Sequence, residues 1–232
     1  MLETQSQKYP ILFWENLEIG YPGGTSLIYP FSGQISHAGI YAIVGQNGCG
    51  KSTLLKTWLG LIPPLRGKLS LQNSPISTQP GLSHGVAYVP QFHAVNKYFH
   101  ISVVDFIKQG FGPNHKMTED DKFTISQLLV DWQIRGGLNQ SFHELSGGQK
   151  VRCMLVRAIV SKPKILFLDE PLASLDVCCQ HQLMETLDDM VLNQGVTVLM
   201  VDHHLDVFSN FITHNLEFHR HHDDVKSSVQ MI

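Results

Sequence analysis

Nine residues between positions 45 and 53 combine glycines, a lysine and hydroxyl groups at a spacing suited to phosphate. They follow the apolar run 40–44 directly and are Gly45, Gln46, Asn47, Gly48, Cys49, Gly50, Lys51, Ser52 and Thr53. Glycines let backbone N–H groups approach an anion, because no Cβ intervenes. A helix that opens at Lys51 points its positive end at the same anion. Lys51 adds a charge for the β- and γ-phosphates, and the Ser52 hydroxyl can ligate Mg²⁺. The sequence therefore predicts a site for a nucleoside triphosphate with magnesium.

A second candidate for chemistry is the acidic pair Asp169 and Glu170, which ends the apolar run 165–168. The run shows no polar alternation, as in parallel strands that are buried on both faces. Such strands present ligands at their carboxyl ends. Asp169 can hold Mg²⁺, directly or through water, and Glu170 can take a proton from the water that attacks the γ-phosphate. Acidic residues end strands in many folds, but beside a phosphate-binding loop the pair indicates nucleotide hydrolysis.

The elements that must position these groups follow from the apolar patterns and the Gly and Pro breaks. The patterns predict strands over 12–19, 27–29, 34–35, 40–44, 69–71, 86–89, 165–168 and 196–201. They predict helices over 52–61, over most of 101–160 and over 178–194. The middle block is expected to form a helical lobe inserted into one α/β core. The polar residues 219–224 are expected to fray.

Composition limits the class of protein. The chain has 232 residues, of which 43% are hydrophobic and 16% charged, which suits one domain with a sizeable core. A net charge of -3 gives no reason to expect nucleic acid as the main partner. The sequence has neither an apolar run of membrane-spanning length nor the features of a secretory signal. Four cysteines without a disulfide spacing favour reduced thiols in the cytosol.

Residues 145–149 read Leu-Ser-Gly-Gly-Gln, directly ahead of a helical run. With the phosphate-binding loop before it and the acidic pair after it, this motif resembles the nucleotide-binding subunit of an ATP-binding cassette (ABC) protein, over nearly the whole chain. The resemblance implies one domain, 1–232, with an α/β P-loop NTPase fold. The implied parts are a RecA-like core of mainly parallel sheet, an antiparallel β subdomain, a helical lobe at about 92–160 and a polar C-terminal tail, 214–232. The implied cofactors are ATP and Mg²⁺.

The resemblance also assigns roles to the signature motif. Ser146, Gly147 and Gly148, followed by Gln149, form a second anion nest that closes on the ATP of a partner subunit. One copy of each motif therefore implies a head-to-tail dimer of this chain with two ATP molecules between the subunits. Asp176 lies in the loop that touches the opposite subunit. Taken alone, the motif is also compatible with an ordinary helix N-cap that follows a flexible segment.

Further positions match the family one at a time. Gln91 matches the glutamine that reaches Mg²⁺ and the attacking water. Tyr21 stands where the family stacks an aromatic ring on adenine, although Tyr29 competes for this place. His203 matches the histidine that contacts the γ-phosphate. Because the family pattern Thr-His-Asp is Asp-His-His here, His204 is the fallback. No catalytic position is lost, so the resemblance implies an active ATPase.

Two classes of function remain for the process that this ATPase drives. One is the motor of a membrane transporter, peripheral on the inner face of the cell membrane, with separate permease subunits and indirectly a substrate-binding protein. The other is a soluble ABC ATPase of iron-sulfur cluster assembly. The stretch 92–110 is similar to the permease-contacting segment of the importers of zinc, manganese or iron(II). An importer of zinc or manganese is therefore favoured, with iron chelates, haem or cobalamin as alternatives.

Two groups of His and Cys residues are candidates for metal binding. One is the tail, with His219, His221, His222 and Asp223, where solvation is favoured over ligation. The other lies in the helix 178–194, where Cys178 and His181 share a face while Cys179 points elsewhere. That arrangement favours packing over a metal site.

Overall fold

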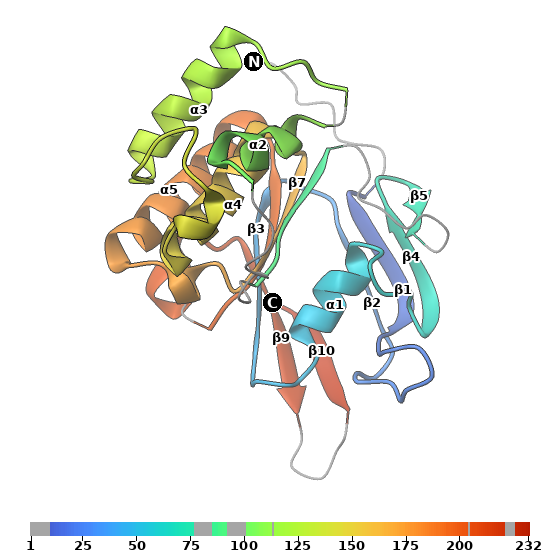
Figure 1. The fold of residues 1–232 in the computed structure, drawn as a ribbon. Helices are drawn as coiled ribbons and strands as arrows, with labels where there is room; N and C mark the ends of the chain where they lie inside the picture. Colours follow the sequence, from blue (N-terminus) through green and yellow to red (C-terminus); the bar gives the residue numbers. More distant parts are fainter. Residues whose placement is uncertain (1–9, 77–84, 92–100, 113, 204, 221–225) are drawn as a thin grey trace, which may run out of the picture.

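The fold is a six-stranded, mainly parallel sheet flanked by helices on one face and by a smaller antiparallel sheet beyond the other (Figure 1). The computed structural model describes residues 10–76, 85–91, 101–112, 114–203, 205–220 and 226–232. The central sheet has the order β10-β9-β3-β8-β7-β6, and the second sheet has the order β2-β1-β4-β5. The predicted α/β fold with an antiparallel subdomain is confirmed.

The antiparallel sheet is built from four strands near the start of the chain. They are β1 (Leu12–Glu18), β2 (Phe31–Ile35), β4 (Arg66–Leu71) and β5 (Ser74–Pro75). The central sheet comprises β3 (Gly39–Gly45), β6 (Val86–Val89), β7 (Ile165–Asp169), β8 (Thr197–Val201), β9 (His214–Arg220) and β10 (Ser227–Met231). Its strands pair in parallel except β10, which is antiparallel to β9.

The helices fall into two groups. The first helix, α1 (Lys51–Trp58), lies between the two sheets (Figure 1). The others are α2 (Val103–Lys108), α3 (Glu119–Asp131), α4 (Gly147–Val160) and α5 (Val177–Gln194). Short 3₁₀ turns adjoin these helices at η2 (Gln109–Phe111), η3 (Phe142–Glu144) and η4 (Leu172–Ser174), and η5 (Leu205–Phe211) lies between β8 and β9. None of the helices in the described part of the chain combines the length and hydrophobicity that crossing a bilayer requires.

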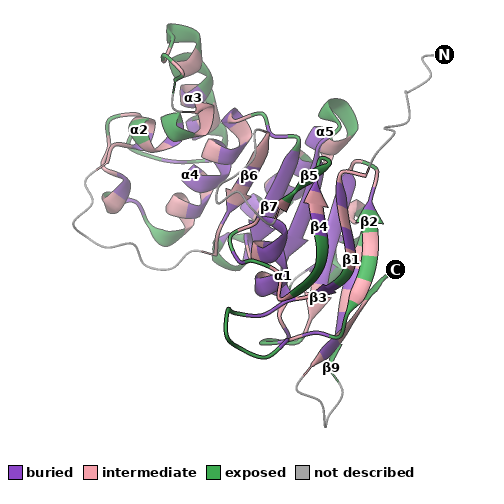
Figure 2. Ribbon diagram, turned by 90° about the vertical axis from the view of Figure 1, so that its right-hand side faces the viewer, coloured by how far each residue is buried: buried purple, intermediate pink, exposed green. Residues whose placement is uncertain are grey.

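The central sheet separates two hydrophobic cores, because successive side chains of a strand point to opposite faces. Leu166 and Leu168 of β7 join the core under α4 and α5. Ile165 and Phe167 of the same strand join the core that contains α1 and the antiparallel sheet. Both faces are covered, which explains the continuous apolar run in this strand and its full burial (Figure 2).

Several expected boundaries move. The first helix ends at Trp58 rather than Leu61, and the segment 27–29 contributes only an isolated bridge from Ile28 to Ser227 in place of a strand. The next strand starts earlier than expected, at Phe31. The region 101–160 is helical as expected, in three helices broken near its glycines. Positions 92–100 of the expected lobe lie outside the described residues.

The expectation that residues 219–224 fray is wrong for His219 and Arg220, which belong to β9. β9 pairs with β3 in the central sheet, and β10 completes its edge. The polar residues of this segment alternate with Leu216 and Phe218, whose side chains are buried in the core beside α1. Polar composition therefore reflected one exposed face of a strand and not disorder. Residues 221–225 lie outside the described part.

Candidate functional site

The predicted phosphate-binding loop connects β3 to α1. Gly45, Gly48 and Gly50 all have positive φ angles, of 150°, 75° and 109°. A Cβ on Gly45 would lie 2.7 Å from the Cβ of Phe218, so the backbone of β9 also requires glycine there. Lys51 is buried, and its Nζ donates to the carbonyls of Gly45 and Gln46, each at 2.8 Å. The loop thus encloses a fixed ammonium group within reach of its own backbone.

The remaining loop residues contribute mainly through their backbone. Gln46 and Asn47 are exposed, whereas Cys49 and Thr53 are buried. Burial raises the pKa of the Cys49 thiol, although Lys51 Nζ lies 3.9 Å from its sulfur. A protonated, buried thiol is a packing group, so the loop chemistry depends on Lys51, Ser52 and the backbone.

The acidic pair lies next to this loop because β8 alone separates β3 from β7. Ser52 Oγ in the first turn of α1 donates to Asp169 Oδ1 at 2.8 Å. Asp169 is buried at the end of β7, where its backbone is level with Val201 of β8. A hydroxyl and a carboxylate oxygen this close are a chemically suitable pair for Mg²⁺.

The three predicted catalytic side chains meet at one carboxylate. Gln91 Nε2 donates to Glu170 Oε2 at 2.6 Å, and His203 Nε2 lies 3.5 Å from Glu170 Oε1. These residues come from three neighbouring strand ends, those of β6, β7 and β8. Glu170 has a φ of 51°, a conformation that non-glycine residues rarely adopt and that surrounding contacts must hold. The alternative His204 lies outside the described residues.

Two residues at these strand ends were not assigned by the sequence. Burial, followed by the charge of Asp169 and a hydrogen bond with it, raises the pKa of the Tyr88 hydroxyl well above its usual range. Tyr88 therefore stays protonated and supports the Asp169 carboxylate. Asp202 is buried after β8, and its Oδ2 accepts the backbone N–H of Leu172 at 2.9 Å. The signal for Asp202 was a charged residue directly after an apolar strand.

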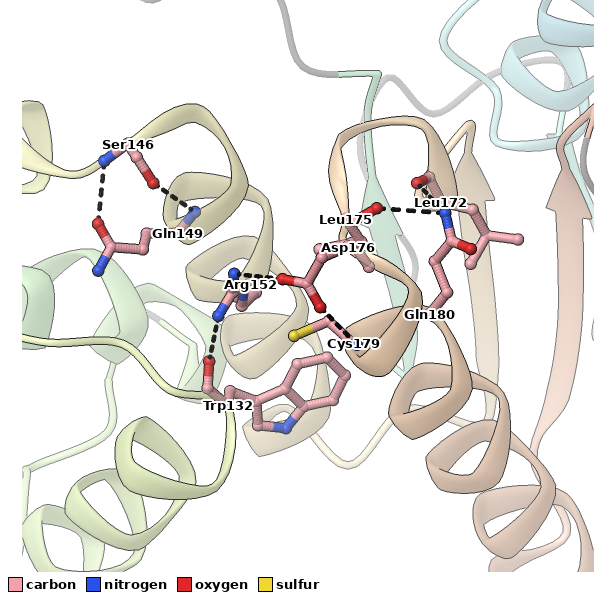
Figure 3. Close-up of polar contacts among 9 residues, drawn as sticks. All are labelled: Trp132, Ser146, Gln149, Arg152, Leu172, Leu175, Asp176, Cys179 and Gln180. Atoms are coloured by element: carbon pink, nitrogen blue, oxygen red, sulfur yellow. Dashed lines mark hydrogen bonds and ion pairs between the residues drawn. The ribbon is translucent and has the colours of Figure 1, made fainter.

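The signature motif forms the N-terminus of α4 (Figure 3). Ser146 Oγ accepts the N–H of Gln149 at 3.3 Å, and Gln149 Oε1 accepts the N–H of Ser146 at 3.0 Å, which is a capping box. Ser146 and Gly147 are exposed. Gly148 faces the next loop, where a Cβ would lie 3.0 Å from the Ser174 carbonyl oxygen. The first turn of α4 therefore combines free surface with close backbone packing.

Asp176 begins α5 and connects it to α4 (Figure 3). Its Oδ1 accepts the N–H of Cys179 at 3.0 Å, and its Oδ2 accepts from Arg152 Nη2 at 3.1 Å. The bond from Cys179 is the main reason that the pKa of Asp176 is lowered. Arg152 also donates to the Trp132 carbonyl at 3.2 Å. This junction joins the signature helix, the end of α3 and the loop before α5.

The candidate adenine contact is exposed and lies on a loop near the phosphate-binding loop. Tyr21 is 58% exposed. Its flanking residues Ile19 and Leu27 lie within 4 Å of where a Cβ of Gly50 would be. The competitor Tyr29 donates its N–H to the carbonyl of Ser227, and Lys226 lies 5.6 Å from its ring centre. An exposed ring near the loop is free to stack on a ligand, and the adenine contact of Tyr21 stays a prediction.

Neither metal candidate gains support from the residues that the structure describes. Cys178 and His181 are exposed while Cys179 is buried, and the His181 ring packs against Phe208. In the tail, His219 Nε2 lies 3.4 Å from Glu217, and the other tail candidates fall outside the described ranges. Among the residues described, no group of three His, Cys, Asp or Glu side chains could hold a metal ion.

Comparison with known proteins agrees with this geometry. Residues 28–173 match the family model described as ABC transporter. The chain is 32% identical over 209 residues to the chelated iron transport system membrane protein YfeB of Yersinia pestis, covering 88% of this chain and 70% of that protein. It is also 32% identical over 165 residues to the thiamine import ATP-binding protein ThiQ of Yersinia pseudotuberculosis serotype I (strain IP32953), covering 71% and 69%.

Solved structures give the same result. A provisionally assigned metal-chelate type ABC transporter in an inward-facing conformation superposes with a TM-score of 0.72 at 27% identity, covering 96% of this chain and 83% of that one. The structure of cbiO1 from Clostridium perfringens, part of the transporter complex cbiONQ, has a TM-score of 0.72 at 27% identity, with 95% and 87% covered.

Proposed function

The chain belongs to the ABC transporter family, and from that premise we propose that it is the ATP-hydrolysing subunit of an importer that carries a transition metal. As an ABC ATPase it couples ATP hydrolysis to transport. The observation that carries the assignment of its active site is the meeting of Gln91, Glu170 and His203 beside the phosphate-binding loop.

ATP binding is the task of the loop 45–53. Backbone N–H groups of the loop and the N-terminus of α1 donate to the phosphates. Lys51 exchanges its contacts with the carbonyls of Gly45 and Gln46 for contacts with β- and γ-phosphate oxygens. Tyr21 stacks on the adenine ring.

Ser52, Asp169 and Gln91 would hold Mg²⁺. They supply hydroxyl, carboxylate and amide oxygens, the ligand types that this ion prefers, and the first two are already 2.8 Å apart. When bound with ATP, the ion neutralises charge on the phosphates and aligns them. The Tyr88 hydroxyl orients the Asp169 carboxylate within this set.

Glu170 acts as the general base. Its carboxylate takes a proton from water as the water oxygen bonds to the γ-phosphorus and the bond to the β,γ-bridging oxygen breaks. Gln91 and His203 contact the two oxygens of this carboxylate and orient it and the water. His203 also contacts the γ-phosphate.

The site is completed by a second copy of the chain. The exposed turn formed by Ser146 and Gly147, with Gly148, presents N–H groups and a helix N-terminus outward, as an anion site requires. A head-to-tail dimer places this turn, with Gln149 behind it and the Asp176 loop beside it, on the ATP of the partner.

The replacement Glu170→Gln tests the catalytic assignment. It keeps the shape and removes the proton acceptor, so ATP turnover should fall by roughly 10²- to 10⁴-fold while ATP binding persists. Glu185→Gln on the exposed surface of α5 is the matched control and should hydrolyse normally. Turnover near the wild-type rate in Glu170→Gln would transfer the role of base to another group.

The cargo is proposed to be a divalent transition metal, with zinc or manganese as the first candidates. Support comes from the similarity of residues 92–110 to the metal-importing subgroup and from relatives whose names refer to chelated iron and metal chelates. Those relatives also favour an iron chelate as the second candidate. In this proposal the subunit lies peripherally on the inner face of the membrane. Its helical lobe transmits the ATP-dependent closure of the dimer to a separate permease.

Cellular metal content discriminates between these cargoes. Deleting the gene should lower zinc or manganese, and wild type but not Glu170→Gln should restore it. Loss of iron-chelate, haem or cobalamin uptake with normal zinc and manganese would select the second candidate, and loss of thiamine uptake would point to the cargo named for ThiQ. Normal uptake of every solute with failing iron-sulfur enzymes would favour cluster assembly instead.

A further inference from the structure

Strand β8 is followed by a buried carboxylate, Asp202, beside the proposed catalytic centre. Its side chain is 2% exposed. A buried carboxylate needs hydrogen-bond donors, since its charge is otherwise costly to remove from water. One donor is the backbone N–H of Leu172, 2.9 Å from Asp202 Oδ2. The carboxylate thus connects the end of β8 with the turn that follows the acidic pair.

This hydrogen bond acts on the backbone close to Glu170. Pro171 has no N–H, so the N–H of Leu172 is the first backbone donor after Glu170. On the other side, the N–H of Glu170 itself donates to the carbonyl of Val201 at 2.7 Å. Val201, the last residue of β8, and Asp202, which follows it, therefore hold the backbone at Glu170 and immediately after it.

Glu170 needs such support because its φ of 51° is unfavourable for a residue with a Cβ. If the turn relaxed, the backbone of Glu170 would rotate toward a commoner conformation and swing its carboxylate. The contacts of that carboxylate, 2.6 Å to Gln91 and 3.5 Å to His203, leave little room for such a movement.

The turn is also fixed from the side of α5 (Figure 3). Gln180 Nε2 donates to the carbonyls of Leu172 and Leu175, at 3.0 and 3.2 Å. Leu172 is therefore held through its N–H by Asp202 and through its carbonyl by Gln180. Loss of the first bond leaves the peptide before Leu172 free to turn while the rest of η4 stays anchored.

We propose that Asp202 is a positioning residue for ATP hydrolysis, whose carboxylate holds the peptide of Leu172 and thereby keeps Glu170 in its left-handed conformation with its side chain facing Gln91 and His203. The proposal rests on Glu170 as the general base. It assigns Asp202 no contact with ATP, so its effect belongs to kcat and not to nucleotide affinity.

The test compares Asp202→Ala with Asp202→Asn in the full-length chain. Alanine removes the acceptor, and kcat for ATP should fall by roughly 10- to 100-fold with KM changed by less than about twofold. Asparagine offers a carbonyl oxygen to the same N–H and should recover most of the rate. Asp206→Ala, an exposed carboxylate on the same segment, is the matched control and should be unaffected.

A double-mutant cycle with Glu170→Gln provides the readout that a merely structural role would not give. If Asp202 acts through Glu170, Asp202→Ala should add no further loss to the residual rate of Glu170→Gln. Thermal melting of every variant checks folding, and Asp202→Asn keeps the question testable if the alanine variant does not fold.

Three outcomes would overturn the proposal: normal kcat in Asp202→Ala, a parallel loss of ATP affinity, or a full additive loss in the double mutant. Failure to fold in both Asp202 variants would overturn it too, because the residue would then serve stability. An active Glu170→Gln enzyme would instead refute the general-base assignment, and this result is distinguishable because it appears without any change at Asp202.

Discussion

The two regions proposed to bind anions differ in how their polar groups are arranged. At the ends of β3, β6, β7 and β8, polar side chains contact one another across elements, as Ser52 contacts Asp169 and Gln91 contacts Glu170. At the N-terminus of α4, the side-chain bonds of Ser146 and Gln149 among the described residues stay within their own turn, and Gly147 is exposed to solvent.

The strand-end region has the contacts of a site formed within one chain, whereas the signature turn has the exposure of a surface that binds a second chain. At the strand ends the proposed base, Glu170, contacts its proposed orienting groups, and Ser52 contacts Asp169. The signature turn offers backbone donors that are fixed by a cap and face outward. Its helix is connected to the rest of the same chain by the bond from Arg152 to Asp176 (Figure 3). This contrast supports the model in which the two regions meet only when two chains associate.

The largest effect should come from Ser146→Arg, which breaks the outward surface alone. Its bulk and charge should prevent closure on the partner's ATP and lower hydrolysis by roughly 10²- to 10³-fold, because the transition-state donors are lost. Size-exclusion chromatography with ATP in the Glu170→Gln background measures the dimer. Asn139→Arg on a nearby exposed loop is the control. A dimer that persists in Ser146→Arg would contradict the shared-site model, as would a Glu170→Gln protein that stays monomeric with ATP in the presence of its permease.

Phe218→Ala tests whether the C-terminal hairpin supports the phosphate-binding loop. Phe218 is 4% exposed and packs beside Gly45 and Gly50, so truncation should cost about 3 kcal/mol of unfolding free energy, measured in urea. Tyr21→Ala is the complementary variant, since its exposed ring should contribute little to stability but about 1–3 kcal/mol to nucleotide binding. Equal stability of both variants would show that the hairpin is dispensable.

Lys51→Ala tests the phosphate-binding loop, which belongs to the strand-end region. Removing the ammonium group should weaken ATP binding by roughly 10- to 100-fold, the size of a charge-assisted hydrogen bond, while the monomer stays folded. Binding of a fluorescent ATP analogue measures this loss. Lys56→Ala, further along α1, is the control. Unchanged affinity in Lys51→Ala would remove the lysine from the phosphate site.

The smallest effect concerns the cap of α5, which joins this helix to α4. Asp176→Ala removes the N-cap of α5 and should cost about 1 kcal/mol of unfolding free energy in chemical denaturation. Because the folded state lowers the pKa of Asp176 below its ordinary value, the cap stabilises fully above that ordinary value and is lost as the pH falls through the lowered one. The difference between wild type and Asp176→Ala should therefore shrink in acid. A constant difference at low pH would contradict the capping role.

The motifs and strands of the core could be predicted because their signals are local. Three glycines and a lysine at fixed spacing, or the apolar run before Asp169, have the same meaning in any chain that folds. The C-terminal hairpin could not be predicted in this way. Leu216 and Phe218 alternate with polar residues over too few positions to predict a strand. Only the pairing of β9 with β3 decides that these side chains are buried.

The sequence by itself determined the phosphate-binding loop, the acidic strand end, the signature turn and the α/β class, since each depends on residue type and spacing. Tertiary structure decided which of these groups meet. Strand order places β8 between β3 and β7, brings Gln91 and His203 to the same carboxylate, and puts Asp202 against the N–H of Leu172, 30 positions earlier. Such contacts depend on pairing between distant segments, which the packing of two cores around one sheet selects and no local pattern encodes.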